Sequence, residues 1–264
     1  MSQMDFASTI VLNNIDQLEN NINNVAVVQL ATLAESELGL SPADILLGEV
    51  DGASKTKVTA DSLVDYLTSL IEKAAGNSKA VNVMLYDKIS NDAPVMGFRG
   101  VSGYRSTEGH AYFSAECSAI KAAISKGIKV DILVPFVRTA SEAATAIDLL
   151  AEQGLVRGFE QLKVYLVSQL PANVLQTEAL LAYFDGVFID ADSLAVFTLG
   201  TLGGDETPAY TVFKTNETVI SLIHHALLQT EKSGKPGWLV TRGDGEAKKL
   251  VDKLELAAGS VVLA

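Results

Sequence analysis

The sequence predicts an α/β fold, a single (β/α)8 barrel (TIM barrel) that spans residues 1–264. Short β-branched or apolar runs alternate with longer amphipathic segments, which is typical of a parallel sheet crossed by helices. The short runs are apolar on both faces, as strands are when helices cover both sides of a sheet. Pro and Gly mark the junctions between segments. An open doubly wound sheet is the alternative.

Nine runs are expected to be strands, one more than a closed eight-stranded barrel needs. They are Thr9–Leu12, Val25–Leu30, Val81–Leu85, Val95–Phe98, Asp131–Phe136, Lys163–Val167, Gly186–Ile189, Trp238–Thr241 and Val261–Leu263. Apolar residues three and four positions apart predict the helices between them. These helices are Ala60–Ala75, Ala115–Lys126, Thr139–Gln153, Val174–Tyr183 and Glu217–Lys232. Residues Gly200–Tyr210 are expected to form a mobile loop.

The composition narrows the classes of partner. The chain has 20 Lys and Arg against 32 Asp and Glu, and this net charge of −12 disfavours nucleic acid. The apolar runs are too short to cross a membrane, and the first residues lack a signal-peptide pattern, so we expect a cytoplasmic protein. A single cysteine, Cys117, excludes an intrachain disulfide.

Polar residues follow the predicted strands, where a barrel of this kind places its active site. They are Gln29, Tyr86, Asp87, Arg99, Arg138, Gln169, Asp190, Asp192, Thr241 and Arg242. Arginine and aspartate dominate this set, and it contains no histidine or cysteine. Thiol chemistry and Ser-His chemistry are therefore not indicated.

A binding site for a small anion is expected at Arg99, together with Arg242 and Gln169. Arg99 is flanked by Gly100, and a guanidinium beside a small residue can approach a planar carboxylate or phosphate. The alternative is an ion pair between Arg99 and an aspartate at a neighbouring strand end.

Asp190 and Asp192 could share a hard cation, with Asp87 as a third ligand. The alternative is that such aspartates cap the helix that follows. Histidine and cysteine do not add to this site. We expect His110 in a loop, and His224 and His225 in a helix with a structural or solvent-facing role, because neither has a metal partner at helical spacing. Cys117 is expected to pack as a small hydrophobic residue.

Several motifs resemble one known family. They are Met96-Gly97-Phe98-Arg99-Gly100, Ala115-Glu116-Cys117, Val134-Pro135-Phe136-Val137-Arg138-Thr139, Tyr183-Phe184-Asp185-Gly186 and Thr198-Leu199-Gly200. The chain resembles the C-terminal phosphoenolpyruvate/pyruvate-binding barrel of phosphoenolpyruvate synthase (pyruvate, water dikinase). The resemblance implies a (β/α)8 barrel and a homo-oligomer. The family enzymes also have an ATP-binding domain and a phosphohistidine domain, which this sequence lacks, so we do not expect it to phosphorylate pyruvate alone.

The sequence departs from the family pattern at positions where the resemblance implies catalytic, metal-binding or substrate-binding residues. The resemblance places the two Mg²⁺ ligands, a glutamate and an aspartate, at Gln169 and Ser193, and the proton-donating cysteine at Val240. Three substrate-binding arginines correspond to Met84, Gln29 and Gly103. Gln and Ser are weak ligands for a hard cation, and enolate chemistry needs both the cation and an acid.

Two hypotheses about function follow. In the first, the barrel has lost its catalytic chemistry, needs no cofactor, and acts as a binding or regulatory protein toward a small anion such as an oxoacid or phosphate. In the second, it is an active Mg²⁺-dependent transferase or lyase that acts on phosphoenolpyruvate, pyruvate or a related oxoacid. Asp190, Asp192 and Asp87 would then form a displaced metal site.

Overall fold

A computed structural model describes residues 9–12, 14, 16–17, 25–40, 45–46, 58–87, 99–200, 213–241, 245–255 and 261–263. Its strands are β1 (Thr9–Leu12), β2 (Val25–Val28), β3 (Ala80–Met84), β4 (Lys129–Val134), β5 (Val164–Ser168), β6 (Val187–Asp190), β7 (Gly237–Thr241) and β8 (Val261–Leu263). Their order in the sheet follows their order in the chain. The ladders β2–β3–β4 and β5–β6–β7–β8 are formed by parallel strands. Sequential parallel strands joined through helices are the topology of a (β/α)8 barrel, which confirms the predicted fold class.

The helices alternate with these strands. They are α2 (Leu30–Leu38), α4 (Leu63–Ala75), α5 (Val101–Tyr104), α6 (Thr107–Ser125), α7 (Ala140–Glu152), α8 (Pro171–Leu175), α9 (Thr177–Leu180), α10 (Ala191–Leu199), α11 (Glu217–Lys232) and α12 (Gly245–Leu254). Short 3-10 helices cover Ala60–Ser62, Gly76–Ser78, Phe159–Gln161 and Phe213–Thr215. No helix in these ranges is long and apolar enough to cross a bilayer.

Some local predictions need correction. His110 lies in helix α6 and not in a loop, because Ser106 caps this helix by accepting a hydrogen bond from the backbone N–H of Gly109. The helix expected at Val174–Tyr183 is divided into α8 and α9. The fourth predicted strand, Val95–Phe98, and positions 201–210 of the expected loop lie outside the described residues.

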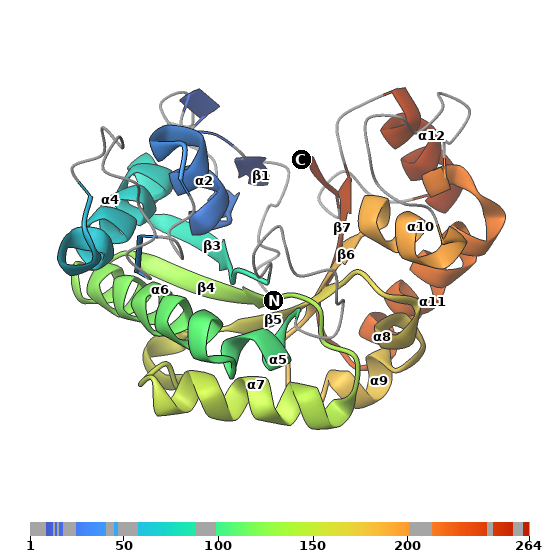
Figure 1. Ribbon diagram of the computed structural model, residues 1–264. Helices are drawn as coiled ribbons and strands as arrows, with labels where there is room; N and C mark the ends of the chain where they lie inside the picture. The colour runs from blue at the N-terminus through green and yellow to red at the C-terminus, as the bar shows by residue number, and fades with distance from the viewer. Residues whose placement is uncertain are drawn as a thin grey trace. The chain divides into compact units, whose positions relative to one another are not determined.

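The chain separates into two compact units. The N-terminal unit contains residues Ile10–Pro135 and Thr145–Lys163. Its strands β2, β3 and β4 are in register, with Val81 of β3 opposite Ala26 of β2 and Val130 of β4. Helices α4 and α6 pack against each other in this unit (Figure 1). The apolar stripe predicted for α4 is buried, as its spacing of three and four residues requires.

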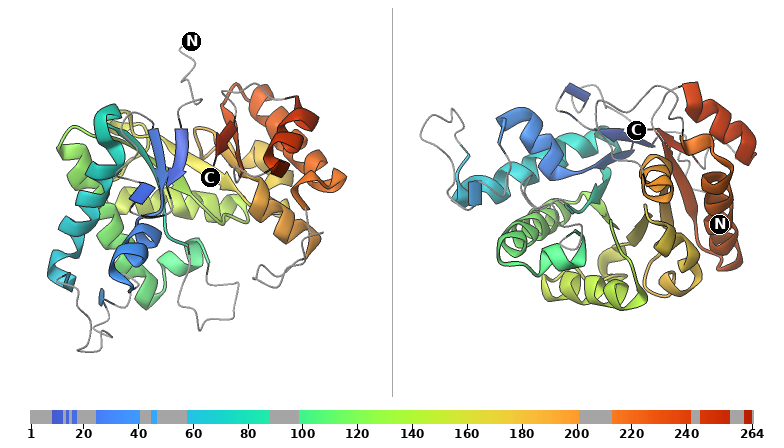
Figure 2. Two further views of the ribbon diagram at one scale, coloured as in Figure 1. Left: turned by 90° about the horizontal axis from the view of Figure 1, so that it is seen from above. Right: turned by 45° about the vertical axis from the view of Figure 1, so that its right-hand side comes forward.

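The C-terminal unit contains Met1–Thr9, Phe136–Ala144 and Val164–Ala264. An aromatic cluster forms part of its core: the ring of Tyr165 lies 5.5 Å from that of Phe188 and 5.3 Å from that of Trp238, centroid to centroid. Helices α10 and α11 contact each other and β6 and β7; they are drawn in orange in both views of Figure 2. This packing places the start of α10 directly after the end of β6.

Candidate functional site

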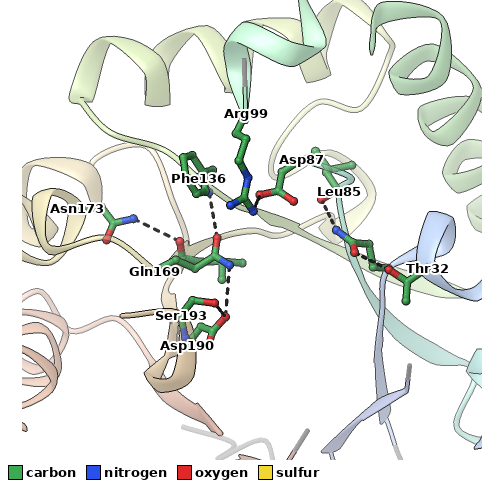
Figure 3. Close-up of polar contacts among 11 residues, drawn as sticks. Thr32, Leu85, Asp87, Arg99, Phe136, Gln169, Asn173, Asp190 and Ser193 are labelled. Carbon is green, nitrogen blue, oxygen red and sulfur yellow. Dashed lines mark hydrogen bonds and ion pairs between the residues drawn. The ribbon is translucent and has the colours of Figure 1, made fainter. Parts of the chain in front are cut away.

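In the N-terminal unit, Arg99 and Asp87 form an ion pair. Nη2 of Arg99 lies 2.5 Å from Oδ2 of Asp87, which is the alternative predicted for this arginine (Figure 3). The side chain of Asp87 is 8% exposed and that of Arg99 is 30% exposed. Burial raises the pKa of Asp87, and the charge of Arg99 opposes this shift. The arginine is therefore the solvent-facing member of a pair whose carboxylate is buried.

The amide of Gln29 joins the ends of β2 and β3. Its Nε2 donates to the carbonyl of Leu85 at 3.5 Å, and its Oε1 accepts from the hydroxyl of Thr32 at 2.7 Å. Thr32 belongs to the first turn of α2. At the position where the family resemblance implies a substrate-binding arginine, this chain has a glutamine whose hydrogen bonds are made within the protein.

A cluster of buried polar groups lies in the same unit. Glu116 is fully buried on α6, and its Oε2 accepts from the backbone N–H of Tyr86 at 3.2 Å. The hydroxyl of Tyr104 is also buried, and the side chain of Tyr112 interacts with Glu116. Burial raises the pKa of Glu116 to about 8. Glu116 is not among the residues predicted for the site, although a charged residue on the apolar face of a predicted helix is a signal of burial.

In the C-terminal unit, Asp190 accepts hydrogen bonds from both Gln169 and Ser193 (Figure 3). Nε2 of Gln169 donates to Oδ2 of Asp190 at 3.3 Å, and Oε1 of Gln169 accepts from the backbone N–H of Phe136 at 3.3 Å. Asp190 caps α10, because it accepts from the backbone N–H of Ser193 at 3.0 Å and from its hydroxyl at 2.6 Å. Burial raises the pKa of Asp190, and these hydrogen bonds oppose the shift.

Asp192 lies beside a lysine that the sequence analysis did not select. Nζ of Lys214 is 3.3 Å from Oδ1 of Asp192 and donates to the hydroxyl of Thr241 at 3.1 Å. Lys214 is 5% exposed, which is rare for this residue type. It lies in the 3-10 helix that precedes α11, where no sequence pattern predicts burial of a charge.

The family resemblance implies a Mg²⁺ ion at this end of the sheet, but the residues present do not fit one. Both ends of the Gln169 amide are used by protein groups. The carboxylate of Asp190 caps a helix, and an ammonium already faces that of Asp192. A divalent cation would have to displace that ammonium and to accept neutral ligands in place of carboxylates. In the described part of the chain, no three His, Cys, Asp or Glu side chains are grouped closely enough to share a metal.

The other selected residues are placed as follows. Arg138 pairs with Glu142 through Nη1 at 3.0 Å, and its guanidinium lies over the ring of Phe136 at 4.9 Å. Arg242 lies outside the described residues. Cys117 is fully buried, as predicted, and His224 and His225 lie in α11 as expected.

Comparison with known proteins identifies the family. A sequence model described as "PEP-utilising enzyme, PEP-binding domain" matches residues 59–256. The chain belongs to this family. Phosphoenolpyruvate synthase of Pseudomonas aeruginosa is 38% identical over 144 residues, which cover 54% of this chain and 18% of that protein. The enzyme of Escherichia coli is 36% identical over 145 residues, with the same coverage.

A third phosphoenolpyruvate synthase, from Neisseria meningitidis, is 31% identical over 166 residues, which cover 61% of this chain and 21% of that protein. The matched part of this chain therefore spans about a fifth of the length of these relatives. The resemblance found in the sequence motifs is confirmed.

Solved structures support the fold of this PEP-binding domain. A citrate synthase variant aligns with a TM-score of 0.52 and 14% identity, over 97% of this chain and 84% of its own. An HpcH/HpaI aldolase from Desulfitobacterium hafniense aligns with a TM-score of 0.50 and 11% identity, over 97% of this chain and 85% of its own. At such low identity these likenesses show the fold alone.

Proposed function

We propose that this PEP-binding domain has lost metal-dependent catalysis and acts as a binding or regulatory protein. The observation that carries the proposal is that Gln169 and Ser193 both donate hydrogen bonds to the carboxylate of Asp190. At the two positions where the family resemblance places metal ligands, this chain has neutral side chains whose polar groups are used within the protein. The domain would need neither Mg²⁺ nor another cofactor.

The ligand we propose is a small anion, an oxoacid or a phosphate, contacted by Arg99. Its guanidinium is the more exposed member of the pair with Asp87, and the buried carboxylate fixes its orientation. A fixed, planar guanidinium suits two-pronged recognition of a carboxylate or phosphate. Because no metal contributes to this contact, binding should not depend on a divalent cation.

The rival function, a Mg²⁺-dependent enzyme with displaced carboxylates, has less support. Asp190 and Asp192 are close enough for the charge of Asp192 to raise the pKa of Asp190. Asp190 is nevertheless a helix cap, Asp192 pairs with Lys214, and Asp87 pairs with Arg99. Each carboxylate of that hypothesis therefore has a structural partner that a metal would have to replace.

Two measurements test the proposal. Isothermal titration with phosphoenolpyruvate and with inorganic phosphate, in excess EDTA, should give binding that Arg99→Met abolishes and Lys232→Met leaves unchanged; Lys232 is an exposed lysine at the end of α11. Added Mg²⁺ should not strengthen this binding. Nuclear magnetic resonance should detect no deuterium exchange into the methyl group of pyruvate. Mg²⁺-dependent exchange or Mg²⁺-dependent binding would contradict the proposal.

A further inference from the structure

A groove opens in the N-terminal unit at the end of the sheet opposite to Arg99. Arg99 pairs with Asp87 just beyond the carboxyl end of β3, whereas the groove lies at the amino end of the neighbouring strand β4. Its volume is about 230 Å³. The end of α6, the start of β4 and the segment Gly154–Leu162, which follows α7, form its walls. Since a barrel performs its chemistry at the other end of its strands, this groove is separate from the site described above.

Exposed apolar side chains line the groove. Phe159 is 65% exposed and Val156 is 48% exposed, while Leu155 and Leu162 are buried beneath them. An aromatic ring and a branched side chain that both remain exposed in one concave surface mark a place where an apolar group of a ligand can be buried.

The turn that carries Phe159 is held in an unusual backbone conformation. Glu160 and Gln161 follow it with φ angles of 50° and 65°, in the left-handed region that residues other than glycine rarely adopt. The turn is closed by hydrogen bonds from the N–H of Gly158 to the carbonyl of Leu162, at 2.8 Å, and from the N–H of Leu162 to the carbonyl of Phe159, at 2.9 Å. The ring is therefore presented on a fixed turn.

The groove also contains charged side chains: Lys121, Lys129 and Glu160 line it. Nζ of Lys129 lies 3.8 Å from Oδ2 of Asp131, so Lys121 is the lysine of interest for an anionic ligand. The side chain of Lys121 lies across Gly154, since a Cβ placed at Gly154 would be 3.6 Å from Cδ and 3.9 Å from Nζ of this lysine. An ammonium next to exposed apolar side chains complements a ligand that has one anionic and one apolar end.

We propose that this groove binds a small amphipathic carboxylate, with its charged group at Lys121 and its aliphatic or aromatic body on Phe159 and Val156. The site is independent of the function proposed above, because it shares no residue with it. Its occupant would reach the amino ends of the strands and leave the carboxyl ends open.

Octanoate tests the proposal, with 1-anilinonaphthalene-8-sulfonate as a fluorescent probe. The probe should bind saturably to the full chain, octanoate should displace it, and octylamine should not. Lys121→Met and Phe159→Ser should each weaken octanoate binding at least fivefold. The matched controls are Lys232→Met and Leu175→Ser, because Lys232 is also an exposed lysine and Leu175 is 66% exposed on α8; both should keep the affinity of the parent.

Three outcomes would overturn the assignment. Equal losses in the test and control variants would show that octanoate has no preference for the groove. If octylamine displaced the probe as strongly as octanoate does, the charge of Lys121 would not favour anionic ligands. Displacement by an acidic peptide but not by octanoate would assign the groove to a polypeptide partner. Because Lys121 and Phe159 are exposed, circular dichroism should show that both variants fold.

Discussion

The ammonium of Lys214 lies 3.3 Å from the carboxylate of Asp192, in the first turn of α10, which follows β6 directly. The same ammonium donates to the hydroxyl of Thr241, the last residue of β7. A cationic side chain of the protein thus stands at the carboxyl ends of two adjacent strands. This is the end at which barrels of this topology bind their ligands.

Replacing Lys214 with Met should destabilise the protein by about 1–3 kcal/mol. The change leaves the carboxylate of Asp192 partly buried without its cation, and breaking a fully buried pair costs about 3–5 kcal/mol, whereas Asp192 retains 27% exposure. Urea unfolding of K214M, D192N and the double variant should show that the two losses are not additive. Additive losses would mean that the two residues do not interact in solution.

Asp190 should contribute to the stability of the protein by capping helix α10, and its negative charge should contribute little. Asp190→Ala should cost about 1–3 kcal/mol, because it removes the cap of α10 and leaves the amide of Gln169 without its acceptor. Asp190→Asn keeps a capping oxygen and should cost less than half as much. Thermal or urea unfolding of both variants checks this expectation, and equal losses in the two would point to a role for the negative charge.

Metal binding should be recoverable by restoring charge. The triple variant Gln169→Glu, Ser193→Asp, Lys214→Met adds two carboxylates and removes the competing ammonium, so it should bind Mn²⁺ in isothermal titration. The matched control is Ser193→Asn with Lys214→Met and Gln169 retained, which has nearly the same shape without the added charges and should not bind. Binding of Mn²⁺ by the control would show that the missing carboxylates are not the reason why the parent chain binds no metal.

The stability of the protein should fall with rising pH because of Glu116. The pKa of this glutamate is raised from 4.5 in an unfolded chain to about 8. Between these values the folded state holds a proton that the unfolded state has lost, so the free energy of unfolding falls by up to about 1.4 kcal/mol per pH unit. Below about pH 4.5 and above about pH 8 this contribution no longer changes with pH.

Glu116→Gln removes this titration while keeping an oxygen that can accept the hydrogen bond from Tyr86. Urea unfolding at pH 5, 7 and 8.5 should show that the parent loses more stability than E116Q across this range. If the free energies of unfolding of the two proteins changed in parallel with pH, the buried carboxyl group of Glu116 would not be protonated in the folded state.

The fold was predictable because most strands are short runs that are mostly apolar on both faces. This pattern can be read from the sequence without knowing which residues contact one another. The parallel ladders β2–β3, β3–β4, β5–β6, β6–β7 and β7–β8 join strands that the sequence predicted at nearly the same residues. The break between α8 and α9 was not predictable, since the apolar spacing continues across it. The prediction of a loop at His110 is wrong, because a glycine beside it, Gly109, favours a loop in the sequence, whereas in the fold the Ser106 cap places both residues in α6.

The candidate site was predictable in part. Asp190 and Gln169 lie at the carboxyl ends of β6 and β5, as predicted, and the alternatives of a helix cap and an ion pair describe the contacts of Asp190 and Arg99. The strand predicted before Arg99 lies outside the described residues, so the position of Arg99 at a strand end stays a prediction. Burial of Lys214 could not be predicted, because charged side chains are mostly exposed and its burial depends on contacts between segments far apart in the chain. Burial of Glu116 could have been predicted from its position on the apolar face of a helix. Whether any of these residues binds a ligand stays a prediction.

Titration of the unmodified protein with Mn²⁺, followed by electron paramagnetic resonance of the free ion, tests the central claim most directly. With neutral amide and hydroxyl groups at Gln169 and Ser193, and an ammonium beside Asp192, the free Mn²⁺ signal should match that of buffer up to millimolar metal. Stoichiometric loss of the signal that Asp190→Asn or Asp192→Asn abolishes would contradict the claim and restore the metal-dependent enzyme.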